Sequence, residues 1–477
     1  MAGDRDRRRG RIIFDITTTA LWSGPPCGIV RVETEFARFG LAHRDDVVPA
    51  FFDPDSRRFC RVGPAMATSL IGQDTAFDGL SFVNPARKGR RRTDRIPAPL
   101  QPAARWLLQF RRTLLQTLER VRLTTPNRRT AAFADRLQRA VMSPKYRAIM
   151  VKPDGTRRAV LSRESVLGPP LDLTADDVVV CTGAGWTHND IAVIATARRE
   201  AGFRLVLFCH DIIPELFPGF YKAADVATHR DYLRRALPAA DLVVANSRTV
   251  AADVRAWCET EGIALGATAV CTLGADIGAG IGTKPVDAAL PEGLERDRYA
   301  LLVSTIEPRK GHRLIYEAWL KLLAAGVPQR TGFKLVFVGR EGWMVDGLMA
   351  DLRDGARTAG TLLLLTDAAD ATLAALYRDA AFCLYPSRYE GYGLPLIEAF
   401  LHSKAVLASS GGAVPEVVDG LSPCLDPDDP EAWQGMLAAW IADPLARRPF
   451  ETRIRTSFRP RRWAEAAQEF FTLARGA

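Results

Sequence analysis

Short, nearly continuous apolar runs recur along this chain of 477 residues, and each is followed by loop residues and a helical pattern. Apolar runs of this length that alternate with helices predict parallel strands covered on both faces. The runs form two sets, separated by a stretch rich in Gly, Pro and charged residues at 278–298 that is typical of a linker. They lie at residues 11–16, 177–185, 203–211 and 241–247 before it, and at 299–305, 334–340, 361–367, 380–387 and 404–410 after it.

This pattern predicts an α/β protein with two doubly wound, Rossmann-like domains. We expect an N-terminal domain over residues 1–280, interrupted by an insert at about 80–170, and a C-terminal domain over 281–460. Ligands of such sheets bind at the carboxyl ends of the strands, so the cleft between the two domains is the expected site.

Much of the positive charge of the chain lies in the insert. The net charge is +9, but residues 87–147 hold 17 Lys and Arg against three acids, a local balance of +14 that leaves −5 elsewhere. A helix is predicted at 104–123, with Trp106 near its start. One of its faces is apolar and carries Leu107, Phe110, Leu114, Leu118 and Val121.

Two interpretations of this basic helix stay open. A basic amphipathic helix that begins with a Trp is typical of a helix lying on an anionic membrane surface. Every surface helix is amphipathic, however, so the helix could equally pack on its own domain and leave its basic face in water. Nucleic-acid binding is disfavoured, because no stacking aromatic side chains are interleaved with the arginines.

Cysteine and histidine usage indicates no metal site. The eight cysteines stand singly without C-x-x-C spacing, and are interpreted as small buried hydrophobic residues in a reducing compartment. The six histidines show no ligand pattern. No apolar run approaches the ~18 residues of a membrane-spanning helix, and the basic N-terminus lacks an apolar signal core. We therefore expect a cytoplasmic protein, or one peripheral to the inner face of a membrane.

The clearest candidate site lies at residues 385–400, YPSRYEGYGLPLIEAF. A strand ends here, a loop with Gly391 and Gly393 follows, and a helix is predicted from Leu394. The glycines allow close approach to a ligand, and the free N–H groups of the new helix favour an anion. Glu390 and Glu398 would repel a phosphate, so they are better suited as acceptors for sugar or ribose hydroxyls than as solvated surface charges.

A second candidate site, VSTIEPRKGH, follows the strand predicted at 299–305. Arg309 and Lys310 stand where the carboxyl end of that strand opens into the expected cleft. Adjacent cations there suit a pyrophosphate, whose charge grows as a glycosidic bond breaks. The alternative is a helix-entry loop whose basic residues are merely solvated.

These two stretches resemble the retaining GT-B glycosyltransferases of family 4, and the likeness runs through most of the second half of the chain. The resemblance implies that Glu398 holds the ribose and Glu390 the donor sugar, while Arg309 and Lys310 neutralise the diphosphate. The remaining donor-side residues that it implies are Gly339, Arg340, Gly391, Tyr392, Gly393 and Leu394. One departure is that many members have Gly-Arg where this chain has Ser304-Thr305, so Arg309 is taken as the substitute.

The first half resembles the family more loosely. LFCHDIIPELFP is similar to the segment whose histidine faces the reacting sugar, which implies His210, although a lone histidine after a strand is often structural. SGPPCGIVRVE is similar to the first loop and helix, with Gly28 near the donor phosphates and Arg31 toward the acceptor. The final helix, at 461–477, is expected to cross back onto the first domain.

The resemblance implies a hexosyltransferase that acts with retention and needs no metal or other cofactor. Its bacterial polysaccharide branch implies mannose from GDP-mannose as donor, and a glycan or lipid-linked acceptor reached at an anionic membrane through residues 87–147. No nucleic acid is expected as a partner. The alternatives are a nucleotide-sugar epimerase on the same fold and a non-catalytic GT-B partner subunit.

Overall fold

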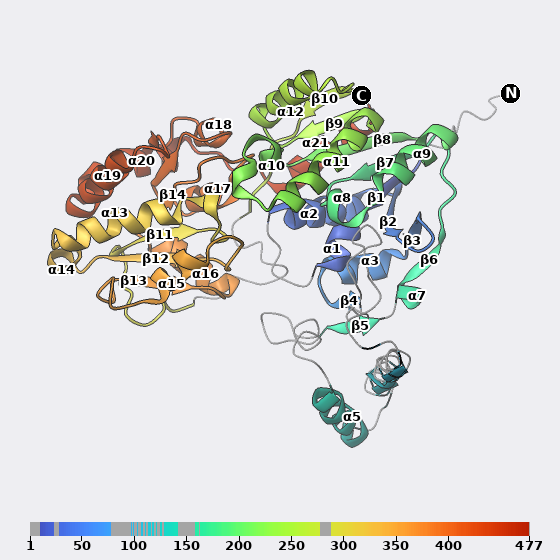
Figure 1. The fold of residues 1–477 in the computed structure, drawn as a ribbon, viewed down its shortest axis with the longest axis horizontal. Helices are drawn as coiled ribbons and strands as arrows, with labels where there is room; N and C mark the ends of the chain where they lie inside the picture. The colour runs from blue at the N-terminus through green and yellow to red at the C-terminus, as the bar shows by residue number, and fades with distance from the viewer. Residues whose placement is uncertain are drawn as a thin grey trace. The chain divides into compact units, whose positions relative to one another are not determined.

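A computed structural model describes residues 10–22, 28–77, 128–141, 158–161, 163–276 and 288–476, together with scattered positions between 97 and 125. The chain divides into two compact units, Met1–Leu205 and Val206–Ala477. Figure 1 follows the chain from the N-terminus in blue to the C-terminus in red.

The first unit is built on a mixed sheet with the strand order β7-β1-β2-β3-β6. The central strands β1 (Ile12–Asp15), β2 (Val47–Asp53) and β7 (Val178–Cys181) run parallel and are buried along their whole length. This burial explains their uninterrupted apolar sequences. The next strand, β3 (Arg58–Val62), pairs antiparallel with β2 and with the edge strand β6 (Leu167–Pro170). Apart from residues 78–158, the described helices of this unit are α1 (Thr17–Leu21), α2 (Gly28–His43), α3 (Pro64–Ile71), α7 (Arg163–Val166), α8 (Gly185–His188) and α9 (Ile191–Ala201).

The predicted insert leaves and rejoins this unit at a small parallel sheet, formed by β4 (Thr75–Phe77) and β5 (Ala159–Leu161). It contains α5 (Arg128–Val141), and its described positions between 103 and 121 are helical. On the face predicted to be apolar, Leu107 and Phe110 are exposed, whereas the other three side chains are half-buried. Leu115, which was not assigned to that face, is buried.

The second unit contains two sets of parallel strands. In the first set, β8 (Arg204–Cys209), β9 (Leu242–Ala245) and β10 (Ala267–Val270) pair side by side. The neighbouring helices are α10 (Ile213–Leu216), α11 (Ala223–Ala239) and α12 (Arg248–Glu261). Ser247 caps the N-terminus of α12, because its Oγ accepts a hydrogen bond from the N–H of Val250 at 3.1 Å.

The second set is a six-stranded parallel sheet with the order β13-β12-β11-β14-β15-β16. Its strands are β11 (Tyr299–Val303), β12 (Lys334–Val338), β13 (Leu362–Leu365), β14 (Phe382–Tyr385), β15 (Val406–Ser409) and β16 (Cys424–Leu425). The helices around it are α13 (His312–Ala324), α14 (Val327–Thr331), α15 (Asp346–Arg353), α16 (Asp370–Asp379), α17 (Leu394–Leu401), α18 (Val414–Val418), α19 (Pro430–Ala442) and α20 (Arg448–Ser457).

Alternate residues of these strands enter two separate cores. Leu302, Phe337 and Leu384 pack with α13, α15 and α19 in one core, while Leu301 and Val336 pack with α16, α17, α18 and α20 in the other. Helices therefore cover both faces of the sheet (Figure 1), and the doubly wound architecture predicted for this half is confirmed.

The last helix, α21 (Trp463–Arg475), packs on the first strand set of its unit. The ring of Phe470 lies 5.9 Å from that of Phe208, and the thiol of Cys271 donates to the carbonyl of Ala466 at 3.4 Å. The predicted boundary near residue 280 falls between the end of β10 and the start of β11. The domain bounds stay predictions.

Two findings bear on the sequence interpretation of cysteines and membranes. Among the described cysteines six are buried, as expected, but Cys424 is exposed because it lies on the short edge strand β16. No helix within the described residues combines the length and the apolar character that membrane spanning requires.

Candidate functional site

The candidate site lies at the carboxyl ends of β11 and β14, which are neighbours in the six-stranded sheet. After β11 the chain forms a short 3-10 helix, Pro308–Lys310, and after β14 it forms a loop that leads into α17. The two segments are joined directly, because the N–H of Arg388 donates to the carbonyl of Arg309 at 2.7 Å. The sheet order thus brings together two motifs that are about 80 residues apart.

Four charged side chains form a chain of ion pairs here. Lys310 Nζ lies 2.5 Å from Glu390 Oε1, and Arg309 Nη1 lies 2.8 Å from Glu390 Oε2. On its other side, Arg309 Nε lies 2.8 Å from Glu307 Oε1. Arg309 Nη1 also donates to the carbonyl of Tyr389 at 2.9 Å. We call Glu307, Arg309, Lys310 and Glu390 the carboxyl-edge cluster.

Burial and the neighbouring charges shift the pKa values of these side chains in different directions. Burial acts to raise the pKa of Glu390, but the facing Arg309 and Lys310 outweigh it and lower the pKa to about 2. Burial also raises the pKa of Glu307, and here the same cations do not offset it fully. Burial acts to lower the pKa of Arg309, but Glu390 and Glu307 outweigh it and raise that pKa well above its ordinary value.

The loop between Glu390 and α17 is shaped by its two glycines. A side chain on Gly391 would meet the carbonyl oxygen of His210, because its Cβ would lie only 2.3 Å away. Gly393 has a φ of +130°, a conformation that favours glycine, and it places Leu394 at the start of α17. α17 begins at Leu394, four residues after Glu390 of the carboxyl-edge cluster; Pro395 has no N–H, and the N–H of Leu396 donates to the carbonyl of Gly393 at 3.1 Å.

Apart from Gly28, the other donor-side residues implied by the family resemblance lie in the same unit. Gly339 and Arg340 follow β12, and the N–H of Ile306 donates to the carbonyl of Arg340 at 2.9 Å. Tyr392 donates its hydroxyl to the carbonyl of Leu273 at 3.1 Å. Glu398 is half-buried on α17, where its Oε2 accepts from the hydroxyl of Tyr377 at 3.2 Å.

His210 is buried just after β8, and its backbone carbonyl lies beside Gly391. Its carbonyl accepts from Asn246 Nδ2 at 2.8 Å, and Ser247 Oγ donates to the carbonyl of Gly391 at the same distance. Gly28 and Arg31 belong to the first unit, where they occupy the first turn of α2. The structure thus gathers His210, Arg309, Lys310, Glu390 and Gly391 within the second unit.

Sequence reasoning did not assign three residues that the structure places at this site. Glu307 contacts Arg309. It could have been found from the sequence, because it stands two residues before Arg309 in the same motif. Asp211 lies close enough to Arg309 and Glu307 to shift the pKa of both. Ser247 holds Gly391 from a distant part of the chain, and no local signal marks it.

Comparisons with known proteins match the part of the chain that carries this cluster. The family model described as Glycosyl transferases group 1 matches residues 297–443. The serotype-specific mannosyltransferase WbdA of Escherichia coli is 29% identical over 239 residues, which are 48% of this chain and 29% of that protein. The O-antigen chain mannosyltransferase B of Escherichia coli is 36% identical over 134 residues, which are 28% of this chain and 34% of that protein.

The chain thus spans about a third of the length of these curated relatives. Among solved structures, sucrose-phosphate synthase from Thermosynechococcus elongatus gives a TM-score of 0.48 at 21% identity, over 63% of this chain and 72% of that one.

Proposed function

We propose that this chain transfers a hexose from a nucleoside diphosphate sugar to a hydroxyl of an acceptor, because residues 297–443 match the family model of group 1 glycosyl transferases. The donor is proposed to be GDP-mannose, and the acceptor a glycan or a lipid-linked glycan of bacterial polysaccharide synthesis. The observation that carries the proposal is the carboxyl-edge cluster, in which Lys310 and Arg309 both contact Glu390 in the loop that leads into α17. The two Escherichia coli relatives named as mannosyltransferases support the choice of sugar.

The proposed roles follow from the charge of each group. Lys310 and Arg309 would bind the diphosphate and stabilise the negative charge that grows on it as the glycosidic bond breaks. The positive end of the α17 dipole would add to this stabilisation without a metal ion. Glu390 would leave the cations and accept hydrogen bonds from sugar hydroxyls, while Glu398 would accept those of the ribose.

We propose that the anomeric configuration is retained because the acceptor attacks and the diphosphate leaves on the same face of the sugar. A double displacement would need a carboxylate nucleophile at the anomeric carbon. In the proposed roles Glu390 binds sugar hydroxyls and Glu398 the ribose, so neither carboxylate is assigned to the anomeric carbon. We therefore propose that the acceptor attacks from the face that the diphosphate leaves, and that His210 lines this site.

Turnover tests the proposal. The purified chain is incubated with labelled GDP-mannose, UDP-glucose, GDP-fucose and dTDP-rhamnose, each with and without a lipid extract of the source bacterium as acceptor. We expect the label to reach the extract from one donor, with release of the nucleoside diphosphate and an unchanged anomeric configuration by NMR. Conversion of the sugar nucleotide without acceptor would instead identify an epimerase, and no binding or turnover of any donor would favour a partner subunit.

We also propose that the basic insert docks on an anionic membrane surface at the cytoplasmic face. Five of the seven large hydrophobic side chains that are exposed among the described residues lie in this insert. They are Trp106, Leu107, Phe110, Phe133 and Leu137, with exposed fractions of 63%, 58%, 54%, 67% and 38%. Exposed apolar side chains in a segment with a charge balance of +14 suit the interface of an anionic bilayer.

Cosedimentation with phosphatidylglycerol vesicles tests the docking proposal. Changing Trp106, Phe110 and Phe133 together to Ser should release the protein from the vesicles while sparing nucleotide binding. Leu445→Ser is the matched control, because Leu445 is 58% exposed in the second unit and should not contribute. Equal sedimentation of the triple variant and the wild type would refute the proposal.

A further inference from the structure

An aromatic pair joins the loop after β12 to the segment after β8. Trp343 Nε1 donates a hydrogen bond to the carbonyl of Phe220 at 2.7 Å. The indole ring of Trp343 also stacks on the ring of Tyr221, with the ring centroids 5.5 Å apart and an angle of 29° between the planes. Both side chains are half-buried. The hydrogen bond fixes the indole, and the indole in turn limits the positions that the ring of Tyr221 can take.

The same loop is joined by its backbone to the motif that carries the cations of the carboxyl-edge cluster. The N–H of Ile306 donates to the carbonyl of Arg340, and the N–H of Gly342 donates to the carbonyl of Ile306, both at 2.9 Å. A side chain on Gly342 would disturb this pairing, because its Cβ would lie 2.7 Å from the carbonyl oxygen of Ile306. Trp343 follows directly, so its place is tied to that of the cluster.

The hydroxyl of Tyr221 lies within range of the charges of this cluster. Arg309, Glu307 and Glu390 act on it electrostatically, and Asp211, which follows β8, does so too. Within the described part of the chain this hydroxyl makes no hydrogen bond. Other tyrosines of the second unit donate their hydroxyl to a carbonyl or carboxylate oxygen at 2.7–3.2 Å; they include Tyr299, Tyr377, Tyr389 and Tyr392. Tyr221 therefore presents an unused O–H group beside the proposed sugar-nucleotide site.

The chemistry of this O–H group suits a phosphate. Burial raises the pKa of Tyr221 above its ordinary value, so the hydroxyl keeps its proton at neutral pH and can donate a hydrogen bond. In the proposed function a diphosphate pairs with Arg309, which brings anionic oxygens into the neighbourhood of the hydroxyl. A hydrogen bond to an anionic oxygen is stronger than one between neutral groups.

We propose that the hydroxyl of Tyr221 donates a hydrogen bond to the diphosphate of the sugar nucleotide, and that Trp343 is a positioning residue that holds the hydroxyl in place. The inference rests on the proposed function, since it concerns the same site. The O–H bond of Tyr221 stays intact, and no proton is transferred. Because charge grows on the leaving diphosphate, the hydrogen bond stabilises the transition state more than the bound donor.

Tyr221→Phe tests the contact, because it removes the hydroxyl and keeps the ring that stacks on Trp343. Calorimetry should show the dissociation constant for GDP or UDP, whichever binds the wild type, rising by about 10–100-fold, as expected when a hydrogen bond to a charged group is lost. The value of kcat should fall at least as far. Tyr316→Phe is the matched control, because its hydroxyl, on α13, lies 3.5 Å from the carbonyl of Asp351. It should leave both quantities unchanged, and thermal unfolding checks that both variants fold.

A double variant tests the positioning role of Trp343. Trp343→Phe keeps an aromatic ring but removes the N–H that donates to Phe220, so kcat should fall by less than in Tyr221→Phe. If Trp343 acts through the hydroxyl, adding Trp343→Phe to Tyr221→Phe should not lower kcat further. A general structural role of Trp343 would instead lower kcat by the same factor in both backgrounds.

The outcomes separate this inference from the proposed function. Equal affinity of Tyr221→Phe and the wild type for the nucleoside diphosphate would overturn the contact, and independent losses in the double variant would overturn the role of Trp343. If neither GDP nor UDP binds the wild type, the proposed function itself fails.

Discussion

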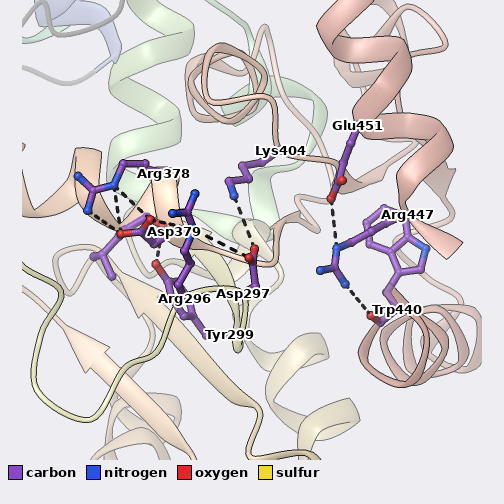
Figure 2. Close-up of polar contacts among 10 residues, drawn as sticks. Arg296, Asp297, Tyr299, Arg378, Asp379, Lys404, Trp440, Arg447 and Glu451 are labelled. Carbon is purple, nitrogen blue, oxygen red and sulfur yellow. Dashed lines mark hydrogen bonds and ion pairs between the residues drawn. The ribbon is translucent and has the colours of Figure 1, made fainter. Parts of the chain in front are cut away.

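The six-stranded sheet carries an ionic cluster at each end, and the two differ in almost every physical respect. At the carboxyl ends of the strands, the cluster of Glu307, Arg309, Lys310 and Glu390 is buried, and its ion pairs measure 2.5–2.8 Å. At the amino ends, Figure 2 shows an amino-edge cluster formed by Arg296, Asp297, Arg378, Asp379 and Lys404.

Apart from the Arg378–Asp379 pair at 2.6 Å, the amino-edge cluster is looser and more exposed. Lys404 and Asp297 are 4.0 Å apart, Arg296 lies 3.6 Å from Asp379, and the side chain of Arg296 is 71% exposed. Such pairs contribute little to stability, because water screens them and long side chains lose entropy. Removing one partner of a buried pair is costly, because it leaves an uncompensated charge. A cluster of this buried kind suits a site where an arriving anion replaces one partner.

The largest effect is expected from breaking the carboxyl-edge cluster on its cationic side. Replacing Arg309 and Lys310 together by Ala should lower kcat by about 10²–10³-fold, the range seen when a preorganised group that stabilises transition-state charge is removed. Donor affinity should fall less, since the leaving diphosphate gains charge in the transition state. Steady-state kinetics separate the two effects, and a change confined to KM would assign the pair to binding alone.

Acid titration of stability probes the anionic side of the same cluster. The pKa of Glu390 is about 2 when folded against 4.5 as its ordinary value, so its ionised form stabilises the fold above about pH 4.5. This contribution, on the order of 3 kcal/mol, is lost as the pH falls toward 2. Urea unfolding should therefore show Glu390→Gln to be less stable than the wild type at pH 7, with the difference shrinking below about pH 4.5. A difference that does not change with pH would contradict the ion-pair account.

Glu398 sharpens the comparison, because it lies one helical turn into α17 and accepts a hydrogen bond from the hydroxyl of Tyr377. In the proposed site it binds the ribose, so Glu398→Ala should weaken nucleoside diphosphate binding by about 1.5–3 kcal/mol, as expected when a charged acceptor is removed. Calorimetry with GDP and UDP measures the loss. Tyr377→Phe is the control, because it removes only the hydroxyl that donates a hydrogen bond to Glu398 in the structure. Unchanged affinity in Glu398→Ala would exclude the ribose assignment.

The smallest effect is expected at the amino-edge cluster. Asp297→Asn should change the free energy of unfolding by at most about 0.5 kcal/mol and leave turnover unaffected, since its contacts with Arg296 and Lys404 are 3.9 and 4.0 Å long. Chemical denaturation and a transfer assay check both expectations. A loss of activity would show that the two ends of the sheet are coupled, which the geometry does not predict.

The buried parallel strands could be predicted from sequence because burial on both faces leaves an uninterrupted apolar run. β1, β11, β12 and β14 all lie within such runs. Two kinds of strand were missed. β2 is buried and parallel, but Pro49 interrupts its apolar run. The edge strand β6 reads Leu-Gly-Pro-Pro and is largely exposed, so neither its composition nor its pattern marks a strand. The exposed Cys424 was misinterpreted for the same reason, since it lies on an edge.

The candidate site was predictable where a motif is local and unpredictable where it depends on distant pairing. Arg309, Lys310 and Glu390 were chosen from two short stretches, and the sheet order then places them in contact. The hydrogen bond from Ser247 to Gly391 joins residues 144 positions apart, and no local pattern encodes it. The excess of acid around Arg309 likewise emerges only when Asp211 is brought close by the fold.

Donor binding by the carboxyl-edge cluster is the central claim, and a thermal shift measurement tests it most directly. The wild type and the Arg309→Ala/Lys310→Ala variant are melted with the four sugar nucleotides of the panel. A donor at about 100 times its dissociation constant should stabilise the wild type by about 2.7 kcal/mol, and the variant should show a much smaller shift. Stabilisation of both proteins to the same extent, or of neither by any sugar nucleotide, would contradict the account.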